Sequence, residues 1–97
     1  MKILDEIKKT INEHKLYLEE KYNVKSMGIF GSYLRGEQSG QSDIDILIEF
    51  HNPVDLFEFI KLENYLSEIL GVKVDLVMKD TLKPRIKDRI LREAVNI

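Results

Sequence analysis

Apolar residues recur every three or four positions at the start of the chain, which predicts an amphipathic helix over residues 2–22. Asn23 is the expected end of this helix. The same period returns at 55–70, with Asp55 as the expected N-cap and Gly71 as the residue that ends the helix. The apolar stripe of the first helix consists of Ile3, Ile7, Ile11, His14 and Leu18.

Three shorter apolar runs, at 24–30, 43–50 and 73–78, have the length and turn-rich borders of β-strands. A last helix is predicted near the end of the chain, with Thr81 as its cap and Pro84 in its first turn. The residues expected on its inward side are Ile86, Ile90, Leu91 and Ala94.

Helices and strands therefore alternate along the chain, and strands covered by helices predict an α/β or α+β fold. The 97 residues are expected to form a single domain, 1–97. A hydrophobic content of 43% with 33% charged residues is typical of a soluble globular protein. No apolar run approaches the ~20 residues that cross a bilayer, and no secretory leader opens the chain, so we expect a cytoplasmic protein without membrane contact.

Charge and cysteine content narrow the possible functions. The formal net charge is −2, which argues against a domain that binds nucleic acid chiefly through its phosphates. The chain has no cysteine, which excludes disulfides, thiolate metal sites and cysteine nucleophiles.

Two acidic residues, Asp43 and Asp45, stand one residue apart at the start of a predicted strand. Because the side-chain period of a strand is two, they point to the same face, with Cα atoms roughly 6–7 Å apart. Asp75 lies in the next predicted strand and can join them if the two strands are neighbours. Carboxylate oxygens are the ligands that Mg²⁺ prefers, so these residues are candidate metal ligands and Asp75 a candidate acceptor of the attacking hydroxyl's proton.

A glycine-serine turn, Gly31-Ser32, follows the first predicted strand. Glycine lets the backbone approach a ligand closely, and the amides that open the following helix attract phosphate. Arg35 is expected either to face this phosphate site, as a contact for phosphate or acceptor, or to be a solvated helix residue. Ser42 is either a hydrogen-bond donor that orients Asp43 or a loop residue.

These two motifs, Gly31-Ser32, ten intervening residues and Asp43-x-Asp45, resemble the signature of the DNA polymerase beta-like nucleotidyltransferases. The surrounding residues are similar to the minimal nucleotidyltransferase (MNT) branch. This resemblance implies a nucleotidyltransferase fold, a small mixed β-sheet of three or four strands packed against about four helices. It also implies that Gly31 and Ser32 hold the nucleotide's phosphates, and that two Mg²⁺ ions are held by Asp43, Asp45 and Asp75.

The resemblance further implies a partner. MNT proteins pair with HEPN ribonuclease toxins, and as antitoxins they transfer AMP from ATP to a tyrosine of the toxin. Two other functions stay open at this point. One is nucleotidyl transfer to a small molecule or an RNA end, and the other is neutralisation of a toxin by binding alone.

Overall fold

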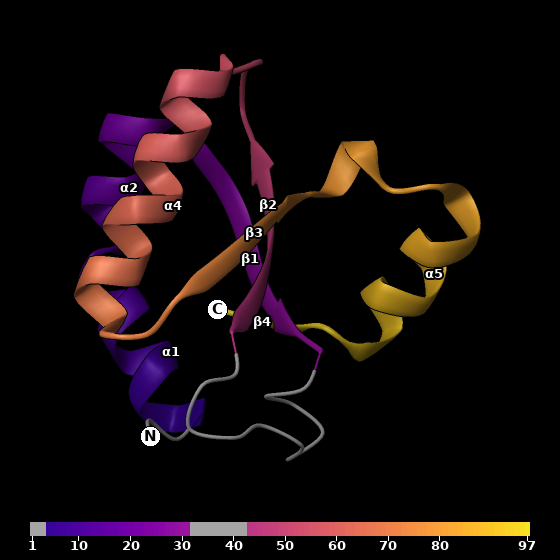
Figure 1. Cartoon of the computed structure of the whole chain (residues 1–97), viewed down its shortest axis with the longest axis horizontal. Helices are drawn as coiled ribbons and strands as arrows, with labels where there is room; N and C mark the ends of the chain where they lie inside the picture. Colours follow the sequence, from indigo (N-terminus) through magenta and orange to yellow (C-terminus); the bar gives the residue numbers. More distant parts are fainter. Residues whose placement is uncertain (1–3, 32–42) are drawn as a thin grey trace.

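The computed structural model describes residues 4–31 and 43–97, which fold around a mixed four-stranded sheet with the strand order β3-β2-β1-β4 (Figure 1). β2 pairs antiparallel with β1 and parallel with β3, and β4 pairs antiparallel with β1. The elements are α1 (Leu4–Glu13), α2 (Lys15–Tyr22), β1 (Val24–Phe30), β2 (Ile44–Phe50), α4 (Leu56–Leu70), β3 (Val74–Met78), the 3₁₀-helix η1 (Lys79–Thr81), α5 (Pro84–Glu93) and β4 (Val95–Asn96). The expected α/β fold is therefore confirmed.

Three helices, α1, α2 and α4, cover one face of the sheet (Figure 1). Their apolar stripes meet the inward side chains of the strands, which alternate with outward ones at the period of two. Each of these core side chains is at most 1% exposed, so this layer carries the main apolar burial of the fold. Its central members are Ile7, Ile11, Leu18, Ile44, Ile46, Ile48, Leu62, Leu66 and Leu70.

The helix expected over residues 2–22 is divided at His14 into α1 and α2. Nδ1 of His14 lies 2.8 Å from the carbonyl oxygen of Thr10, which would accept the His14 backbone N–H in a continuous helix. That N–H instead donates to Ile11 O at 3.0 Å. A side chain that competes for a backbone acceptor in this way interrupts the helical ladder. The predicted end at Asn23 is confirmed by its left-handed backbone, with φ of 57°.

The predicted ends of α4 are also confirmed. Oδ1 of Asp55 accepts the Glu58 N–H at 2.8 Å, and Gly71 ends the helix with φ of 70°. Thr81 was expected to cap the last helix, and this is wrong, because the capping position of α5 is Lys83. Proline disfavours a helical conformation in the residue before it, so α5 cannot begin ahead of Pro84.

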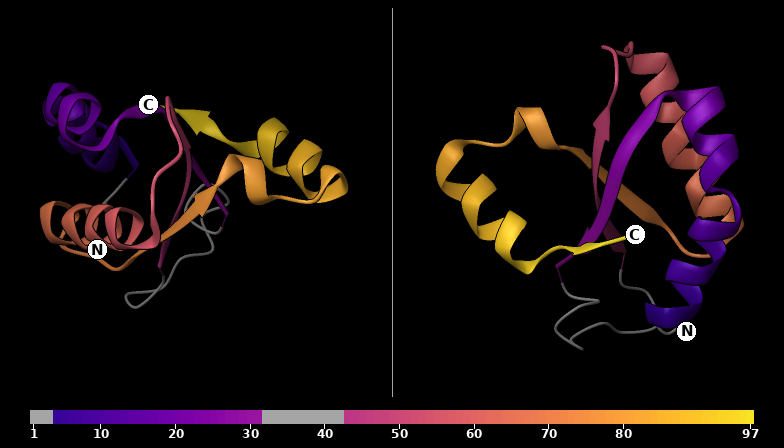
Figure 2. Two further views of the ribbon diagram at one scale, coloured as in Figure 1. Left: turned by 90° about the horizontal axis from the view of Figure 1, so that it is seen from above. Right: turned by 180° about the vertical axis from the view of Figure 1, so that it is seen from behind.

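The last helix, α5, lies on the opposite side of the sheet from the other helices (Figure 2). It leads from β3 at one edge to the short strand β4 at the other, and the periodicity of the chain did not reveal β4. Ile90 and Ala94 are half-buried as predicted, but Ile86 and Leu91 are 49% and 41% exposed, so the predicted inward side is wrong for these two. Within residues 4–31 and 43–97, no helix is long and apolar enough to cross a membrane.

Candidate active site

The parallel pairing of β2 with β3 sets Asp45 and Asp75 opposite each other in register. Neighbouring strands lie about 4.8 Å apart, so the two residues are adjacent across the sheet. Ile46 and Leu76, the residues that follow them, are buried beneath the helices. Because side chains alternate between the faces, Asp45 and Asp75 therefore point to the face that α1, α2 and α4 leave uncovered. The expected neighbourhood of the two strands is confirmed.

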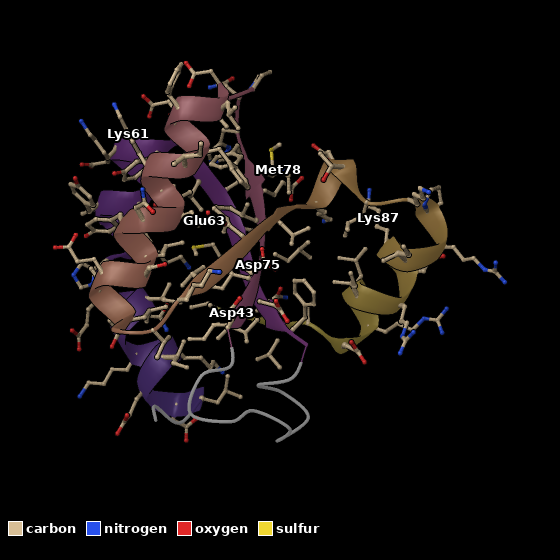
Figure 3. The ribbon with its side chains drawn as sticks, in the orientation of Figure 1. Asp43, Lys61, Glu63, Asp75, Met78 and Lys87 are labelled. Carbon is tan, nitrogen blue, oxygen red and sulfur yellow. The ribbon has the colours of Figure 1, made fainter. Side chains whose placement is uncertain are left out.

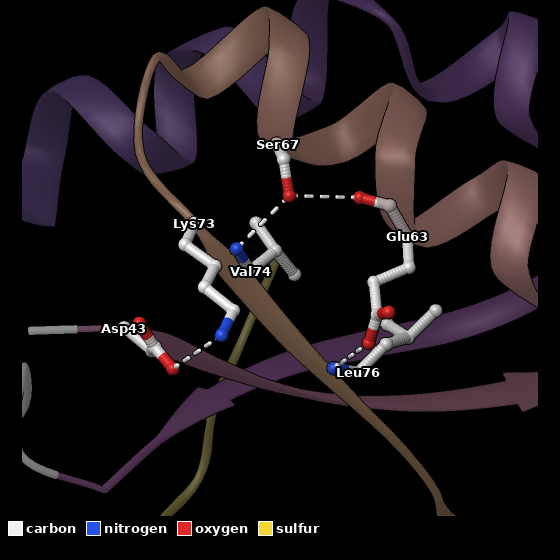
Figure 4. A network of polar contacts seen from close by, with 6 residues as sticks. All are labelled: Asp43, Glu63, Ser67, Lys73, Val74 and Leu76. Atoms are coloured by element: carbon white, nitrogen blue, oxygen red, sulfur yellow. Dashed lines mark hydrogen bonds and ion pairs between the residues drawn. The ribbon is translucent and has the colours of Figure 1, made fainter.

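Asp43 lies directly before β2 and joins the same face. Its Oδ2 atom is 3.8 Å from the Nζ of Lys73, an ion pair shown in Figure 4. Lys73 and Asp75 are two residues apart, so their side chains leave the chain on the same side. Figure 3 shows Asp43 and Asp75 at the same end of the sheet. The topology thus brings the three predicted carboxylates to one end of one face.

Gly31 ends β1 against the carboxylate of Asp45. Its φ of 82° is in the left-handed region, which side-chain-bearing residues rarely adopt. A Cβ atom at this position would overlap Oδ2 of Asp45 and lie 3.1 Å from its Cγ. A side chain here would be strained by the positive φ and would displace the Asp45 carboxylate, so glycine is favoured and the backbone after β1 lies close to the acid.

Two residues that the sequence interpretation did not select, Glu63 and Ser67, hold β3 in place (Figure 4). β3 is an edge strand, and the outward N–H groups of Val74 and Leu76 donate to Ser67 Oγ and Glu63 Oε2, both at 3.0 Å. These bonds satisfy donors that an edge strand would leave open. Their spacing in the sequence could have indicated this role, because Glu63 and Ser67 are four residues apart and so share one side of α4.

The other end of the carboxylate face carries a separate ion-pair group around Glu49. Lys79 and Lys25 approach its carboxylate at 3.6 and 3.8 Å, and Ser26 Oγ donates to it at 3.2 Å. Burial by itself would raise the pKa of Glu49, but the two ammonium groups and the serine outweigh burial and lower that pKa. Since these cations already neutralise Glu49, we assign it a structural role.

The donors at Asp43, Asp45 and Asp75 have the right chemistry for Mg²⁺, because all are hard carboxylate oxygens on one face. They do not form a ready-made cluster: across residues 4–31 and 43–97, no three acidic, histidine or cysteine side chains gather closely enough to hold a metal ion. Carboxylates repel one another, and Asp43 is drawn to Lys73.

The remaining predicted contacts, Ser32, Arg35 and Ser42, lie outside the residues that the structure describes, so their roles stay predictions. Of the predicted nucleotide contacts, only Gly31 is described, and it lies beside Asp45. The arrangement places three anionic oxygen donors next to a backbone bend, which can bind a phosphate-bearing ligand through divalent cations.

Comparison with known proteins matches residues 11–97 to the nucleotidyltransferase domain family. The chain is 51% identical over 98 residues to protein MJ1217 of Methanocaldococcus jannaschii, with all of both chains covered. MJ1217 is provisionally named a protein adenylyltransferase. It is 46% identical over 97 residues to the protein adenylyltransferase MntA of Thermococcus cleftensis, covering 100% of this chain and 98% of that one.

Solved structures share the fold. One provisionally described as a minimal nucleotidyltransferase has a TM-score of 0.79 and 34% identity, covering 95% of this chain and 94% of that chain. A second comes from the complex of a tri-AMPylated HEPN toxin of Shewanella oneidensis with its MNT antitoxin. It has a TM-score of 0.66 and 20% identity, and covers 93% of this chain and 70% of that chain. At this identity, the second likeness concerns the fold alone.

Proposed function

The chain belongs to the nucleotidyltransferase domain family, and on that premise we propose that it is a cytoplasmic, Mg²⁺-dependent protein adenylyltransferase antitoxin. Its acceptor would be a tyrosine of a cognate HEPN toxin, and its donor ATP. The observation that carries the proposal is the register of Asp45 with Asp75, beside Gly31, whose lack of a side chain leaves room for the Asp45 carboxylate. Two relatives of similar length bear the name protein adenylyltransferase, which supports a protein as the acceptor.

The proposed reaction is an in-line displacement at the α-phosphorus of ATP. Asp43, Asp45 and Asp75 would hold the divalent cations, which when bound neutralise the charge that develops on the phosphate oxygens. Asp75 accepts the proton of the tyrosine hydroxyl as that oxygen bonds to the α-phosphorus. The bond from the α-phosphorus to the oxygen that bridges to the β-phosphate breaks, and pyrophosphate leaves. The products are an AMP-tyrosine ester and pyrophosphate.

Exposure of the carboxylates suits an acceptor that belongs to another protein. Asp75 is exposed, and Asp45 is half-buried with Gly31 directly beside it. A tyrosine on a protein surface can therefore reach Asp75 without entering a closed pocket. For the phosphates of ATP, we propose contacts with the backbone at Gly31 and with Ser32, Arg35 and Ser42.

Labelling with α-phosphate-labelled ATP tests this function directly. With Mg²⁺ and purified cognate HEPN protein, we expect the wild-type chain to transfer label to a toxin tyrosine, identified by mass spectrometry. Asp45→Asn should remove transfer, whereas Asp5→Asn, a matched change of an exposed acid on α1, should leave it unchanged.

Three outcomes would contradict the proposal. Equal labelling by wild type and Asp45→Asn would exclude these carboxylates from the chemistry. Label on a small molecule or an RNA end, with none on the HEPN protein, would favour the other class of nucleotidyltransferase. Protection from the toxin by an Asp43→Ala/Asp45→Ala double variant, without any labelling, would indicate neutralisation by binding alone.

A further inference from the structure

Three of the four arginines of the chain lie on one short helix. Arg85, Arg89 and Arg92 are all in α5, and the fourth is Arg35. Their spacing of four and three residues puts them on one side of the helix. We call these three residues the arginine stripe. Apart from the four arginines and two histidines, every basic side chain of the protein is a lysine.

The arginine stripe is exposed, and within residues 4–31 and 43–97 no ion pair joins any of its members to an acid. α5 contains four basic and two acidic residues, a net charge of +2 in a chain whose total is −2. The helix is thus a local positive surface on a protein that is otherwise negative.

The sheet-facing side of α5 is separate from the stripe. Lys87 and Ile90 are the half-buried positions of this side, and Lys87 is labelled on α5 in Figure 3. The residues next to the stripe around the helix are Asp88 and Glu93. Beyond them, Ile86 and Leu91 are 49% and 41% exposed, and no residue of α5 is fully buried. α5 therefore presents guanidinium groups and exposed apolar side chains on one helix, and both are enriched at protein interfaces.

The position of α5 relates this surface to the active site. α5 lies on the side of the sheet to which Asp45 and Asp75 point (Figure 2). A hollow lined by Leu47, Leu91 and Ala94 lies between the end of α5 and the sheet, on the same face as Asp45. A protein that rests against α5 therefore lies on the same side of the sheet as the carboxylates, and it contacts the stripe on the side of α5 that faces away from the sheet.

We propose that the arginine stripe docks an acidic surface of the acceptor protein, and so holds the acceptor on the side of the sheet that carries Asp45 and Asp75. This inference depends on the proposed function, because it requires a protein acceptor. The planar guanidinium fork matches carboxylates in a bidentate way that a lysine ammonium cannot. A protein suits the surface better than RNA, because the exposed Ile86 and Leu91 of α5 offer apolar contacts that a chain of phosphates cannot make.

Neutralising the stripe tests the proposal, with Arg85→Gln/Arg89→Gln/Arg92→Gln as the variant. The matched control is Lys9→Gln/Lys21→Gln/Lys61→Gln, which removes the same charge from exposed positions of the helical layer. In steady-state AMP transfer to HEPN protein, the stripe variant should raise the KM for the acceptor by about tenfold or more and leave kcat within about twofold. The control should change neither. The wild-type KM should also rise with salt, and this rise should be weaker in the stripe variant.

Further measurements separate the possible failures. Circular dichroism and the affinity for ATP should be the same in wild type and stripe variant, and Arg85→Lys/Arg89→Lys/Arg92→Lys should recover only part of the loss. If wild type labels no HEPN protein, the proposed function fails. If wild type labels it and the stripe variant retains the wild-type KM and salt dependence, the docking inference alone fails. Loss of binding to a single-stranded RNA oligonucleotide, with unchanged KM for the protein, would also overturn it.

Discussion

The two faces of the sheet use the same strands for different purposes. On β2, Ile44, Ile46 and Ile48 are at most 1% exposed beneath the helices, whereas Asp45 and Glu49 alternate with them on the other face. The first face gains stability from apolar burial. The second face brings like charges together, which is unfavourable for folding alone. The comparison shows that a strand can supply a core and an active site at once, because its side chains alternate.

The pKa values of the titratable groups also respond to different causes on the two sides of the sheet. On the helical side, Tyr65 lies 5.2 Å from Tyr17 and 5.9 Å from Tyr22, measured between ring centroids. Burial, together with Tyr17, raises the pKa of both Tyr22 and Tyr65. On the carboxylate side, ion pairs lower the pKa of Glu49 against the effect of burial. Burial thus sets the direction of the pKa shifts on the helical side of the sheet, and charge pairing sets it on the carboxylate side.

The strongest test of the comparison is Asp45→Asn. We expect kcat/KM for AMP transfer to fall by about 1,000-fold or more, equivalent to about 4 kcal/mol, because a charged oxygen donor of the site is lost. The free energy of unfolding should change far less than the activity, because Asp45 is outside the buried apolar core. Transfer kinetics and urea denaturation measure the two effects. A large loss of stability would contradict the division between the faces.

Ile46→Ala, one residue away on the opposite face, should show the reverse behaviour. Removal of a fully buried side chain should lower the free energy of unfolding by about 3 kcal/mol. Transfer activity of the folded fraction should stay near the wild-type value. Denaturation curves and activity measured well below the unfolding temperature test this prediction, and an inactive but stable variant would contradict it.

Gly31→Ala should affect both faces, because the residue is a backbone bend that contacts a carboxylate. The positive φ and the overlap of the new Cβ with Asp45 should cost about 2 kcal/mol of stability and reduce transfer. Gly28→Ala is the matched control: its Cβ would lie 3.4 Å from the Ala94 Cβ, so only small shifts are needed. Equal losses in the two variants would argue against a specific role of the bend.

Glu63→Ala should loosen β3 by leaving the Leu76 N–H without its acceptor. We expect a loss of about 1–2 kcal/mol in stability and faster hydrogen exchange at Leu76. Glu63→Gln retains a carbonyl oxygen that can accept this bond, so its effect should be much smaller. Unchanged exchange at Leu76 in Glu63→Ala would show that the bond does not hold the strand.

The smallest expected effect is the pH dependence that Glu49 contributes. Its folded-state pKa is lowered, so its contribution to stability is present above the ordinary value of 4.5 and is lost as pH falls through the folded-state pKa. Between about pH 6 and pH 3, wild type should lose up to about 1 kcal/mol more stability than Glu49→Gln. High salt should reduce this difference. Identical pH profiles of the two proteins would refute the ion-pair account.

The local sequence was sufficient for much of the fold. The short apolar run and its turn-rich borders predicted strand β1 with its observed bounds, Val24–Phe30, and the caps Asp55 and Gly71 lie where they were expected. The family was also predicted correctly, from Gly31-Ser32 and Asp43-x-Asp45. Such signals are reliable because they arise from neighbouring residues whose relative geometry is limited by backbone sterics.

The tertiary structure decided what depends on distant residues. Asp75 lies 30 positions after Asp45 and faces it only because β3 pairs with β2 in one particular register. No local pattern indicated three further features. These are the hydrogen bond from Leu76 N–H to Glu63, the close approach of Gly31 to Asp45, and the side of the sheet on which α5 lies. Short-range periodicity specifies which face a side chain occupies, whereas strand pairing across the folded chain determines which side chains meet there.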